Sequence, residues 1–558
     1  MSSLIAQFPS LSSIVSGVAL HLLVLRHGEW DQSAPVIVAW YLAFVAVGLV
    51  LPSVTEFQVG AGPLFQSLIC HIAGLFSSIF IYRVFFHRLR KFPGPILAGI
   101  TAFYATYLSA KKFHKFKEIE NLHQQYGDYV RVGPRELSVA DPRAVLSIYG
   151  PPSKTTKGPF YDGVQPFISL HSDRDKKRHA RRRRTWDHAF STSGNFPPFN
   201  RRDYVNLLII ALRDYEHRVS KYSSQLLSAV SDQVGQAIDM GRWFNYYSFD
   251  IMGDLTFGKS FEMLVTGQDS YMLSTLHNDL QSLGPFLHVM WFIPFFKMIP
   301  GLNNSYTAFW KWLYEQVDTR SKNEPDEPDI FTWLLKEFRT GEQTEKGKLF
   351  LHGDADLAVV AGSDTTAATL TNLFYELASS PTWTAKLQSE IDVVNHSTYR
   401  DLAHMPLLSA TIDETLRLHP PLPSGMQRVT PPQGIRLDDV YIPGDCIVQM
   451  PLHTLFRDER CFAQPTKFIP ERWTTQPELV KDRSAYIPFG SGSFACVGKQ
   501  LALMEMRRVT VDLLSRYDVT LAKEQTHEDF QEGHQDVFTL VHGRGLQLVF
   551  TERKSRNL

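Results

Sequence analysis

The chain has few cysteines and no excess of either charge. Its 558 residues include 57 Lys and Arg, 57 Asp and Glu, and four cysteines. The net charge therefore gives no argument for binding to nucleic acid. The cysteines have neither a disulfide framework nor the spacing of a zinc site, and they are Cys70, Cys446, Cys461 and Cys496. This usage is typical of a reducing compartment, such as the cytosolic side of a membrane.

Past residue 95 the sequence also lacks internal repeats, low-complexity tracts and a second domain boundary. Helical periodicity dominates there, and strand-like segments are short. The clearest predicted helices are Leu207–Val219, Ser224–Ala237, Ala355–Ala378 and Met504–Tyr517. The predicted strands are Tyr129–Val132, Ile435–Leu437, Cys446–Met450 and Leu546–Phe550. We therefore expect one mostly α-helical domain with a small β portion.

The N-terminal region differs because it has long apolar runs and no Lys or Arg before Arg26. Ala34–Leu51 is long enough to span a bilayer, Leu64–Tyr82 is a second such run, and Leu11–Leu25 is a shorter candidate. A cleaved signal peptide would have one apolar core and a basic start. Buried helices of a soluble protein are the alternative, although no amphipathic face is visible. We expect residues 1–90 to form a membrane anchor with two or three transmembrane helices.

A basic cluster follows the last apolar run, within residues 83–91. The positive-inside rule places this cluster in the cytosol, and with three spans the start of the chain would be lumenal. The prolines of Lys91–Pro95 would stiffen the joint to the rest of the chain. Residues 91–558 are then predicted to form the second domain, on the cytosolic side.

The most informative residue is Cys496, which lies in a glycine-rich turn before a predicted helix. Gly490, Gly492 and Gly498 allow a tight turn and a close approach to a flat ligand. A helix N-terminus lowers the pKa of a nearby thiol, and the thiolate is the form that binds a metal. The turn therefore suits a thiolate ligand to haem iron, with Phe489 excluding water from the sulfur. A buried structural cysteine is the alternative.

A second candidate site lies inside the predicted helix 355–378. Ala361–Thr366 places a glycine and several hydroxyl side chains where they weaken the helical hydrogen-bond ladder. Weak positions of this kind often mark functional sites. Asp364 could relay protons from solvent there, and Thr365 could donate to dioxygen. A kink without chemistry is the alternative.

Two further charged patterns are ambiguous on their own. Glu414 and Arg417 share a helix face, but surface pairs of this spacing are common and stabilise little. The basic run 174–184 could bind nucleic acid, which a membrane-anchored chain of zero net charge makes an unfavoured reading. Within it, His179 and Arg183 are four residues apart and can point at one anion.

Together these segments resemble the cytochrome P450 family of haem-thiolate monooxygenases over roughly residues 90 to 550. Five separated motifs occur in the order of that family. Its haem-binding signature is matched by Phe489, Gly492, Cys496 and Gly498. Phe494 departs from the signature, because the family usually has Arg or His there to hold a haem propionate. The resemblance implies that Cys496 is the axial ligand of the iron.

The resemblance also assigns roles to residues outside the signature. Asp364 and Thr365 match the acid–alcohol pair of the helix above the haem and would deliver protons. A Glu-x-x-Arg motif and its second part imply a buried network that fixes the haem pocket, formed by Glu414, Arg417 and Arg472. Propionate-binding roles fall to His179, Arg183 and Arg428, and Arg428 could help to compensate for Phe494.

The fold implied by the resemblance is a triangular helical prism with a small sheet around haem b, preceded by transmembrane helices. The reaction implied is insertion of one oxygen atom from O2 into a lipophilic small molecule. Electrons would come from NADPH through a separate NADPH–cytochrome P450 reductase in the endoplasmic reticulum membrane, with cytochrome b5 as a further candidate donor. The basic residues of 174–184 would face that donor. No nucleic acid partner is expected.

The substrate pocket is expected, by analogy with the family, from four mainly apolar or small segments. These segments are Tyr161–Gln165, Val359–Ala361, Ser424–Met426 and Val537–Leu540. They favour a lipophilic substrate from secondary metabolism, such as an alkaloid, terpenoid or polyketide. Two alternatives are a haem-thiolate isomerase or dehydratase that needs no reductase, and a non-enzymatic membrane protein that binds haem. The presence of Thr365 disfavours the first.

Overall fold

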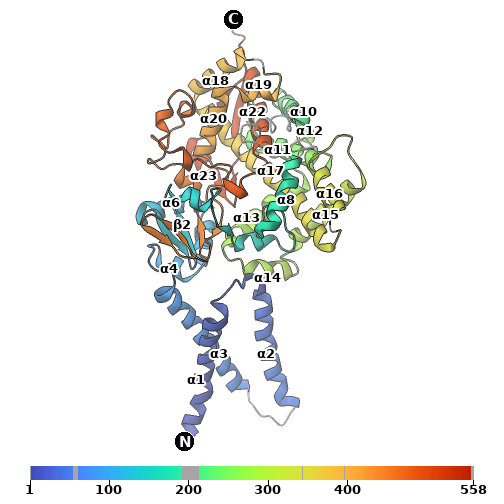
Figure 1. The fold of residues 1–558 in the computed structure, drawn as a ribbon. Coiled ribbons are helices and arrows are strands. Elements are labelled where there is room, and N and C mark those ends of the chain that lie inside the picture. Colours follow the sequence, from blue (N-terminus) through green and yellow to red (C-terminus); the bar gives the residue numbers. More distant parts are fainter. Residues whose placement is uncertain (1, 55–60, 191–212, 342, 395, 555–558) are drawn as a thin grey trace.

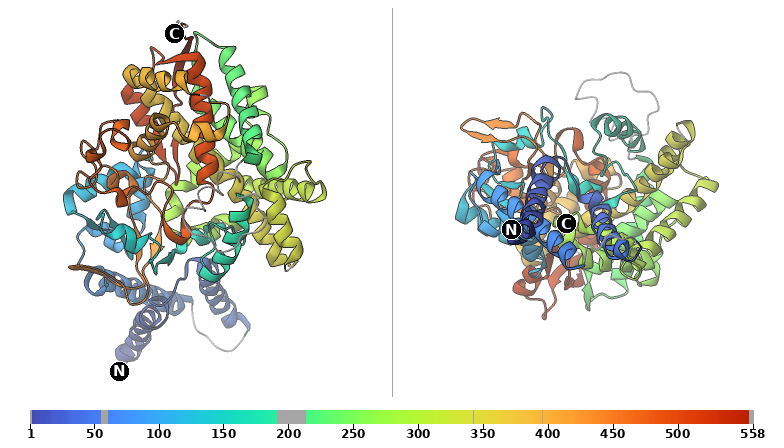
Figure 2. Two further views of the ribbon diagram at one scale, coloured as in Figure 1. Left: turned by 45° about the horizontal axis from the view of Figure 1, so that its top comes forward. Right: turned by 90° about the horizontal axis from the view of Figure 1, so that it is seen from below.

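The structure is a computed structural model that describes residues 2–54, 61–190, 213–341, 343–394 and 396–554. Three N-terminal helices project from a large, mainly helical body, and the views from two further directions agree that they leave it on one side (Figures 1 and 2). They are α1 Ser2–Leu20, α2 Ala34–Val54 and α3 Ala61–Ile81. Asp31–Val50 and Gly62–Phe86 are long and apolar enough to cross a membrane, and Ser10–Leu25 is shorter.

The helices α1 and α3 pack closely along their length. A Cβ atom on Gly17 would lie 2.0 Å from the carbonyl oxygen of His71, and one on Gly74 would meet the backbone of α1 at 2.3 Å. The ring of His71 lies 2.7 Å from the Ser16 hydroxyl and 2.8 Å from the Tyr41 hydroxyl of α2. Small residues and interhelical hydrogen bonds are what hold helices together in lipid. These contacts therefore join α1 to α3 along their length and α2 to α3 at His71.

The body is built mainly from helices of varied length. They are α4 Ile96–Ile100, α5 Phe103–Ala110, α6 Lys115–Tyr126, α7 Ala144–Ile148, α8 Lys176–Ala189, α10 Arg213–Ser231, α11 Met240–Phe257, α12 Met263–Thr266, α13 Tyr271–Leu283, α14 Phe292–Met298, α15 Asn304–Lys322, α16 Ile330–Thr340, α17 Glu345–Ser379, α18 Pro381–Val393, α19 Tyr399–Ala403, α20 Pro406–Leu418, α21 Leu452–Leu455, α22 Lys499–Arg516 and α23 His527–Gly533.

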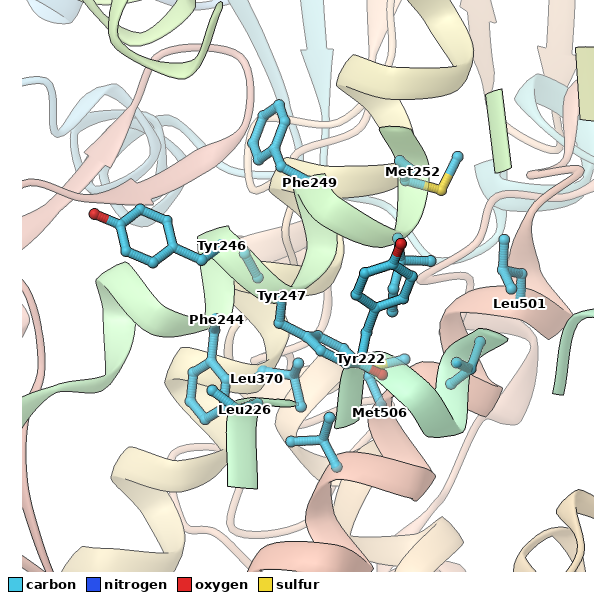
Figure 3. Close-up of a cluster of buried hydrophobic side chains, with 14 of the residues drawn as sticks. Tyr222, Leu226, Phe244, Tyr246, Tyr247, Phe249, Met252, Leu370, Leu501 and Met506 are labelled. Atoms are coloured by element: carbon cyan, nitrogen blue, oxygen red, sulfur yellow. The ribbon is translucent and has the colours of Figure 1, made fainter. Parts of the chain in front are cut away.

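The long helix α17 runs through the centre of the body and organises the main core (Figure 1). It packs against α11 and α22, and α10 packs against both of those helices. Figure 3 shows the shared core, in which the aromatic rings of Tyr222, Phe244 and Tyr247 lie with Leu370 and Met506. Burial of such large apolar side chains is the main driving force that fixes these helices around α17.

The strands form small sheets beside the helices. The five-stranded sheet has the order β1-β2-β8-β5-β3, with β1 Tyr129–Gly133, β2 Glu136–Val139, β8 Ile447–Gln449, β5 Arg428–Val429 and β3 Thr156–Lys157. The three-stranded sheet has the order β4-β12-β9, with β4 Ala237–Asp239, β12 Gln547–Glu552 and β9 Tyr517–Leu521. Two hairpins complete the set, β6 Ile435–Leu437 with β7 Val440–Ile442 and β10 His534–Asp536 with β11 Leu540–His542.

Most predicted elements are found, with one correction. The predictions for residues 355–378 and 504–517 correspond to the longer helices α17 and α22. The predicted helices 207–219 and 224–237 do not form separate elements, because α10 runs without a break from Arg213 to Ser231 and Ala237 already belongs to β4. The part of the first prediction before residue 213 lies outside the described residues.

Candidate active site

The turn that carries Cys496 is shaped by two left-handed glycines. Gly490 and Gly492 have φ values of +69° and +65°, which favour glycine over other residues. A Cβ atom on Gly492 would lie 2.7 Å from the Tyr149 carbonyl oxygen. The turn therefore has no room for a side chain at this position. The Cys496 N–H donates to the Phe489 carbonyl oxygen at 2.8 Å and closes the turn just before α22.

Protein atoms surround the Cys496 thiol, but its surface is exposed to a pocket of about 570 Å³, which Phe489 and Lys499 also line. Burial raises the pKa of the Cys496 thiol, while the N–H groups of Gly498 and Lys499 and the charge of Arg183 act in the opposite direction. These N–H groups belong to the start of α22, as a thiolate site requires. A cation at the sulfur, such as haem iron, would remove the cost of burying the thiolate.

The helix α17 keeps its α-helical form through Ala361–Thr366. Its hydroxyl groups bond back to the helix, and Thr365 Oγ1 donates to the Ala361 carbonyl oxygen at 2.9 Å. Ala361 is exposed and Thr365 is half-buried, whereas Asp364 is buried in the middle of the same helix. The two predicted residues therefore leave α17 in different directions.

Asp364 has a partner that the sequence did not indicate. Its Oδ1 atom lies 3.1 Å from Nε2 of His277 on α13, and its Oδ2 atom is buried without a hydrogen-bond partner. The side chain of His277 is 30% exposed, so the pair connects the buried carboxylate with solvent. Burial alone would lower the pKa of His277, but the hydrogen bond and charge of Asp364 raise it. No local pattern could have found this pair, because its members are 87 residues apart.

The structure brings Glu414, Arg417 and Arg472 into one buried network. Glu414 Oε1 accepts from Arg417 Nη2 at 2.8 Å and from Arg472 Nε at 2.9 Å, and Glu414 Oε2 accepts from Arg417 Nε at 2.9 Å. The N–H groups of Ile469 and Trp473 also donate to this carboxylate. All three charged side chains are fully buried. Sequence spacing alone had suggested a surface pair, and the buried position agrees with the role that the resemblance implies.

The predicted propionate-binding residues separate into two groups. His179 and Arg428 lie against the ring of Phe494, with the His179 ring centroid at 4.8 Å and the Arg428 guanidinium carbon at 4.9 Å. Arg183 instead bonds Asp187 at 2.8 Å and the Ala495 carbonyl oxygen at 2.6 Å. The Nε atom of Arg428 is buried without a partner, as expected if an anion is to bind there. These residues and the Cys496 turn together fit the expected haem.

Three of the four expected pocket segments meet in the structure. The Ser424 hydroxyl donates to the Asp536 carboxylate at 2.5 Å. Asp536 ends β10 and directly precedes the expected segment Val537–Leu540. Phe538 stacks on Phe160, next to the expected segment Tyr161–Gln165, with ring centroids 5.0 Å apart. On the fourth segment Val359 is fully buried in the core, so the surface of α17 available to a substrate begins at Val360 and Ala361.

Much of the basic run 174–184 is neutralised inside the protein. Arg178 and Arg182 bond the buried carboxylate of Asp173 at 2.8 and 3.2 Å, and Arg182 also pairs with Asp354 at 2.7 Å. The exposed basic residues of α8 lie on one side of the helix, and they are Lys176, Lys177, Arg181 and Arg184. The run therefore has fewer free positive charges at the surface than its sequence suggests.

Comparison with known proteins gives consistent matches. The family model described as cytochrome P450 matches residues 170–548. A cytochrome P450 monooxygenase from Eupenicillium brefeldianum is 45% identical over 496 residues, which cover 88% of this chain and 98% of that protein. Another from Fusarium pseudograminearum is 42% identical over 557 residues, with 97% of each chain covered. Tryprostatin B 6-hydroxylase from Aspergillus fumigatus is 36% identical over 517 residues, with 90% of this chain and 89% of that protein covered.

Proposed function

The chain belongs to the cytochrome P450 family and is a cytochrome P450 monooxygenase, and we propose that it hydroxylates a lipophilic small molecule of fungal secondary metabolism. The predicted fold, mainly helical with small sheets, is confirmed. The family implies haem, O2, a redox partner and a small-molecule substrate. The observation that carries the proposal is the Cys496 turn, which offers a thiol at the start of α22.

We assign haem b as the cofactor, whose iron Cys496 would hold and whose propionates His179, Arg428 and Arg183 would hold. When bound, the haem supplies the activation of O2 and the oxidation of an unreactive C–H bond. One oxygen atom enters the substrate and the other leaves as water, which consumes two electrons and two protons.

The chain's own residues move those protons and hold the substrate. His277 exchanges protons with solvent and passes them to the Asp364 carboxylate, whose free Oδ2 atom is the next acceptor in line. Thr365 Oγ1, on the half-buried side of α17, is the last donor of the proposed route toward the reacting O2. The apolar segments around Phe160 and Phe538 bind the substrate and keep other water out.

The electrons are proposed to come from NADPH through a separate cytochrome P450 reductase, with cytochrome b5 as a second donor. The exposed basic face of α8 at Lys177, Arg181 and Arg184 supports this assignment, because an acidic donor would be attracted to it. Replacing Lys177 and Arg181 by Glu should lower the rate with reductase, most strongly at low salt. Turnover with a chemical oxidant such as a peroxide should stay unchanged.

Residues 1–90 are proposed to anchor the protein in the endoplasmic reticulum membrane through α1, α2 and α3, with residues 91–558 in the cytosol. The contacts of His71 with both other helices support three spans. The loop between α1 and α2 lies at the body, where Glu29 bonds Arg174 at 2.7 Å. The N-terminus would then be lumenal, so a glycosylation tag there should be modified, and two spans would leave it bare.

The spectrum of the reduced protein with carbon monoxide tests the proposed function. The wild type should show the red-shifted Soret band of a thiolate-bound haem, and Cys496→Ala should lose it. Cys446→Ala, which removes a buried thiol outside the turn, should keep it. Product formation must then require both NADPH and reductase. Turnover without an electron source would indicate an isomerase or dehydratase, and absence of the band in the wild type would contradict haem-thiolate chemistry altogether.

A further inference from the structure

Two buried cations face each other across the edge of the five-stranded sheet. Lys157 of β3 and Arg428 of β5 are register partners in an antiparallel pair. Lys157 is 2% exposed and Arg428 is 3% exposed. Like charges directly opposite each other destabilise a sheet, and burial adds the cost of removing both charges from water. The pairing therefore needs a compensating anion.

The part of the chain that the structure describes supplies neutral oxygen atoms but no carboxylate to this pair. Lys157 Nζ donates to the Leu170 carbonyl oxygen at 2.8 Å. Arg428 Nη1 donates to the Tyr161 hydroxyl and the Gln427 carbonyl oxygen, both at 2.9 Å, while its Nε atom has no partner. Among the described residues, neither cation forms an ion pair with an Asp or Glu side chain.

The acidic group whose charge is found to act on Lys157 is already neutralised. Asp173 acts on the charge of Lys157 from a distance, but its carboxylate is bonded by Arg178 and Arg182. Burial, followed by the charge of Arg428, lowers the pKa of Lys157 to about 6 while no anion is bound. The surroundings of Lys157 and Arg428 thus have too little negative charge to balance the two cations.

Phe494 lies at the centre of this cluster. Its ring centroid is 4.8 Å from Lys157 Nζ and 4.9 Å from the Arg428 guanidinium carbon, and the His179 ring meets it edge-on. The negative face of an aromatic ring attracts cations, so Phe494 holds both side chains in place. It does so from the position in the Cys496 turn where the family usually has a basic residue.

We propose that Lys157 binds a haem propionate in place of the missing basic residue at position 494, with Phe494 orienting its ammonium group. This inference rests on the proposed haem-thiolate function. Haem b carries two propionates, and the two cations of the β3–β5 pair match that charge. Compared with the family pattern, the positive charge lies on Lys157 of β3 rather than in the cysteine turn. Phe494 occupies the position of the usual basic residue.

Retention of haem is the first test. Lys157→Met keeps the length of the side chain and removes its charge. We expect haem to leave this variant for an acceptor protein about ten- to a hundred-fold faster, as for loss of a charged hydrogen bond. Lys154→Met is the matched control, because Lys154 is exposed and three residues away, and it should retain haem like the wild type. Lys157→Arg should restore most of the retention.

The double variant Lys157→Met with Phe494→Arg tests the exchange of positions. The new guanidinium should return the charge to the cysteine turn and bring haem retention back toward the wild-type rate. Phe494→Arg alone should bring no such gain, because it adds a third cation to the cluster. A double variant that loses haem as fast as Lys157→Met would overturn the exchange.

Stability without haem separates binding from a merely structural role. Lys157→Met should make the haem-free protein melt at a higher temperature, since it removes an amine that folding must either bury charged or strip of its proton. It should make the haem-loaded protein melt at a lower temperature. A structural lysine would lower both melting temperatures. The dimethyl ester of haem, which lacks free carboxylates, should bind the wild type and Lys157→Met equally.

The outcomes separate this inference from the proposed function. If the wild type binds haem through Cys496 but Lys157→Met retains haem at the wild-type rate, the role of Lys157 is wrong and the proposed function stands. If the wild type has no thiolate-bound haem, the proposed function fails before Lys157 is tested.

Discussion

Two buried cationic clusters lie in this molecule, and they differ in their source of negative charge. Arg417 and Arg472 surround Glu414, whose carboxylate accepts hydrogen bonds from both. Lys157 and Arg428 are just as buried but face each other without a carboxylate among the described residues. The first cluster is complete within the chain, whereas the second leaves the Arg428 Nε atom unpaired.

The comparison shows how to separate structural from ligand-binding charge in a protein without its cofactor. When a buried cation is paired with an acidic side chain, their attraction offsets the free energy of desolvation as the protein folds. A buried cation that is not paired raises the free energy of the empty protein, and this cost is recovered when an anion binds. The state of hydrogen bonding therefore indicates function where burial and residue type do not.

The largest effect should come from removing the negative charge of Glu414 from its cluster with Arg417 and Arg472. Glu414→Gln leaves two buried guanidinium groups without a countercharge, and loss of one partner of a buried pair costs about 3–5 kcal/mol. We expect this loss in the free energy of unfolding by denaturant, with and without haem. Glu345→Gln is the control, since that side chain is 87% exposed and its removal should change stability little. A fully stable Glu414→Gln variant would show that backbone carbonyl groups alone can hold both arginines.

The next largest effect should distinguish the two clusters by the same substitution. Arg472→Met should destabilise the protein equally with and without haem, because it breaks the Glu414 network. Arg428→Met should leave the empty protein folded and reduce haem affinity by about ten- to a hundred-fold. Thermal unfolding of both variants, measured with and without added haem, checks this. Equal responses of the two variants to haem would remove the distinction.

The sequence predicted the parts of this site whose residues are close in sequence. It did not predict several contacts between distant segments of the chain. Cys496, the Ala361–Thr366 stretch and the Glu414–Arg417 pair are recognisable because their residues are close in sequence. The mainly helical class and the larger part of α22 followed equally from periodicity.

The partners of these residues come from distant segments, so no spacing reveals them. Lys157 meets Arg428 only because β3 pairs with β5, and His277 meets Asp364 only because α13 packs beside α17. Arg183 is an exception, because its partner Asp187 lies one turn further along the same helix. The departure at Phe494 was the one sequence signal that a cation must come from elsewhere.

A third, smaller effect concerns a pair whose charge balance depends on pH. His277 faces Asp364 of α17, and Asp269 acts on its charge from further away. The apolar ring of Phe249 from α11 meets the His277 ring edge-on. The pKa of His277 is raised, so the pair's stabilisation is fully present below the ordinary value of 6.5 and is lost as pH rises through the raised value. His277→Gln keeps an N–H group but does not titrate.

We expect His277→Gln to use more O2 per product than the wild type, with a ratio that no longer varies with pH across this range. Measured O2 consumption and product formation give the ratio. His404→Gln, which changes an exposed histidine, is the control and should behave like the wild type. A wild-type pH profile in His277→Gln would exclude the histidine from proton delivery.

The smallest effect should come from an ion pair that is exposed rather than buried. Glu29, in the loop between α1 and α2, bonds Arg174 at 2.7 and 3.1 Å, and about a quarter of each side chain is exposed. Exposed pairs contribute about 0.2–1 kcal/mol and are screened by salt. Glu29→Gln should therefore lower the free energy of unfolding only slightly, and high salt should abolish the difference. A salt-independent loss as large as that of Glu414→Gln would mean that the anchor loop is part of the folded body, because only a pair shielded from solvent keeps its strength at high ionic strength.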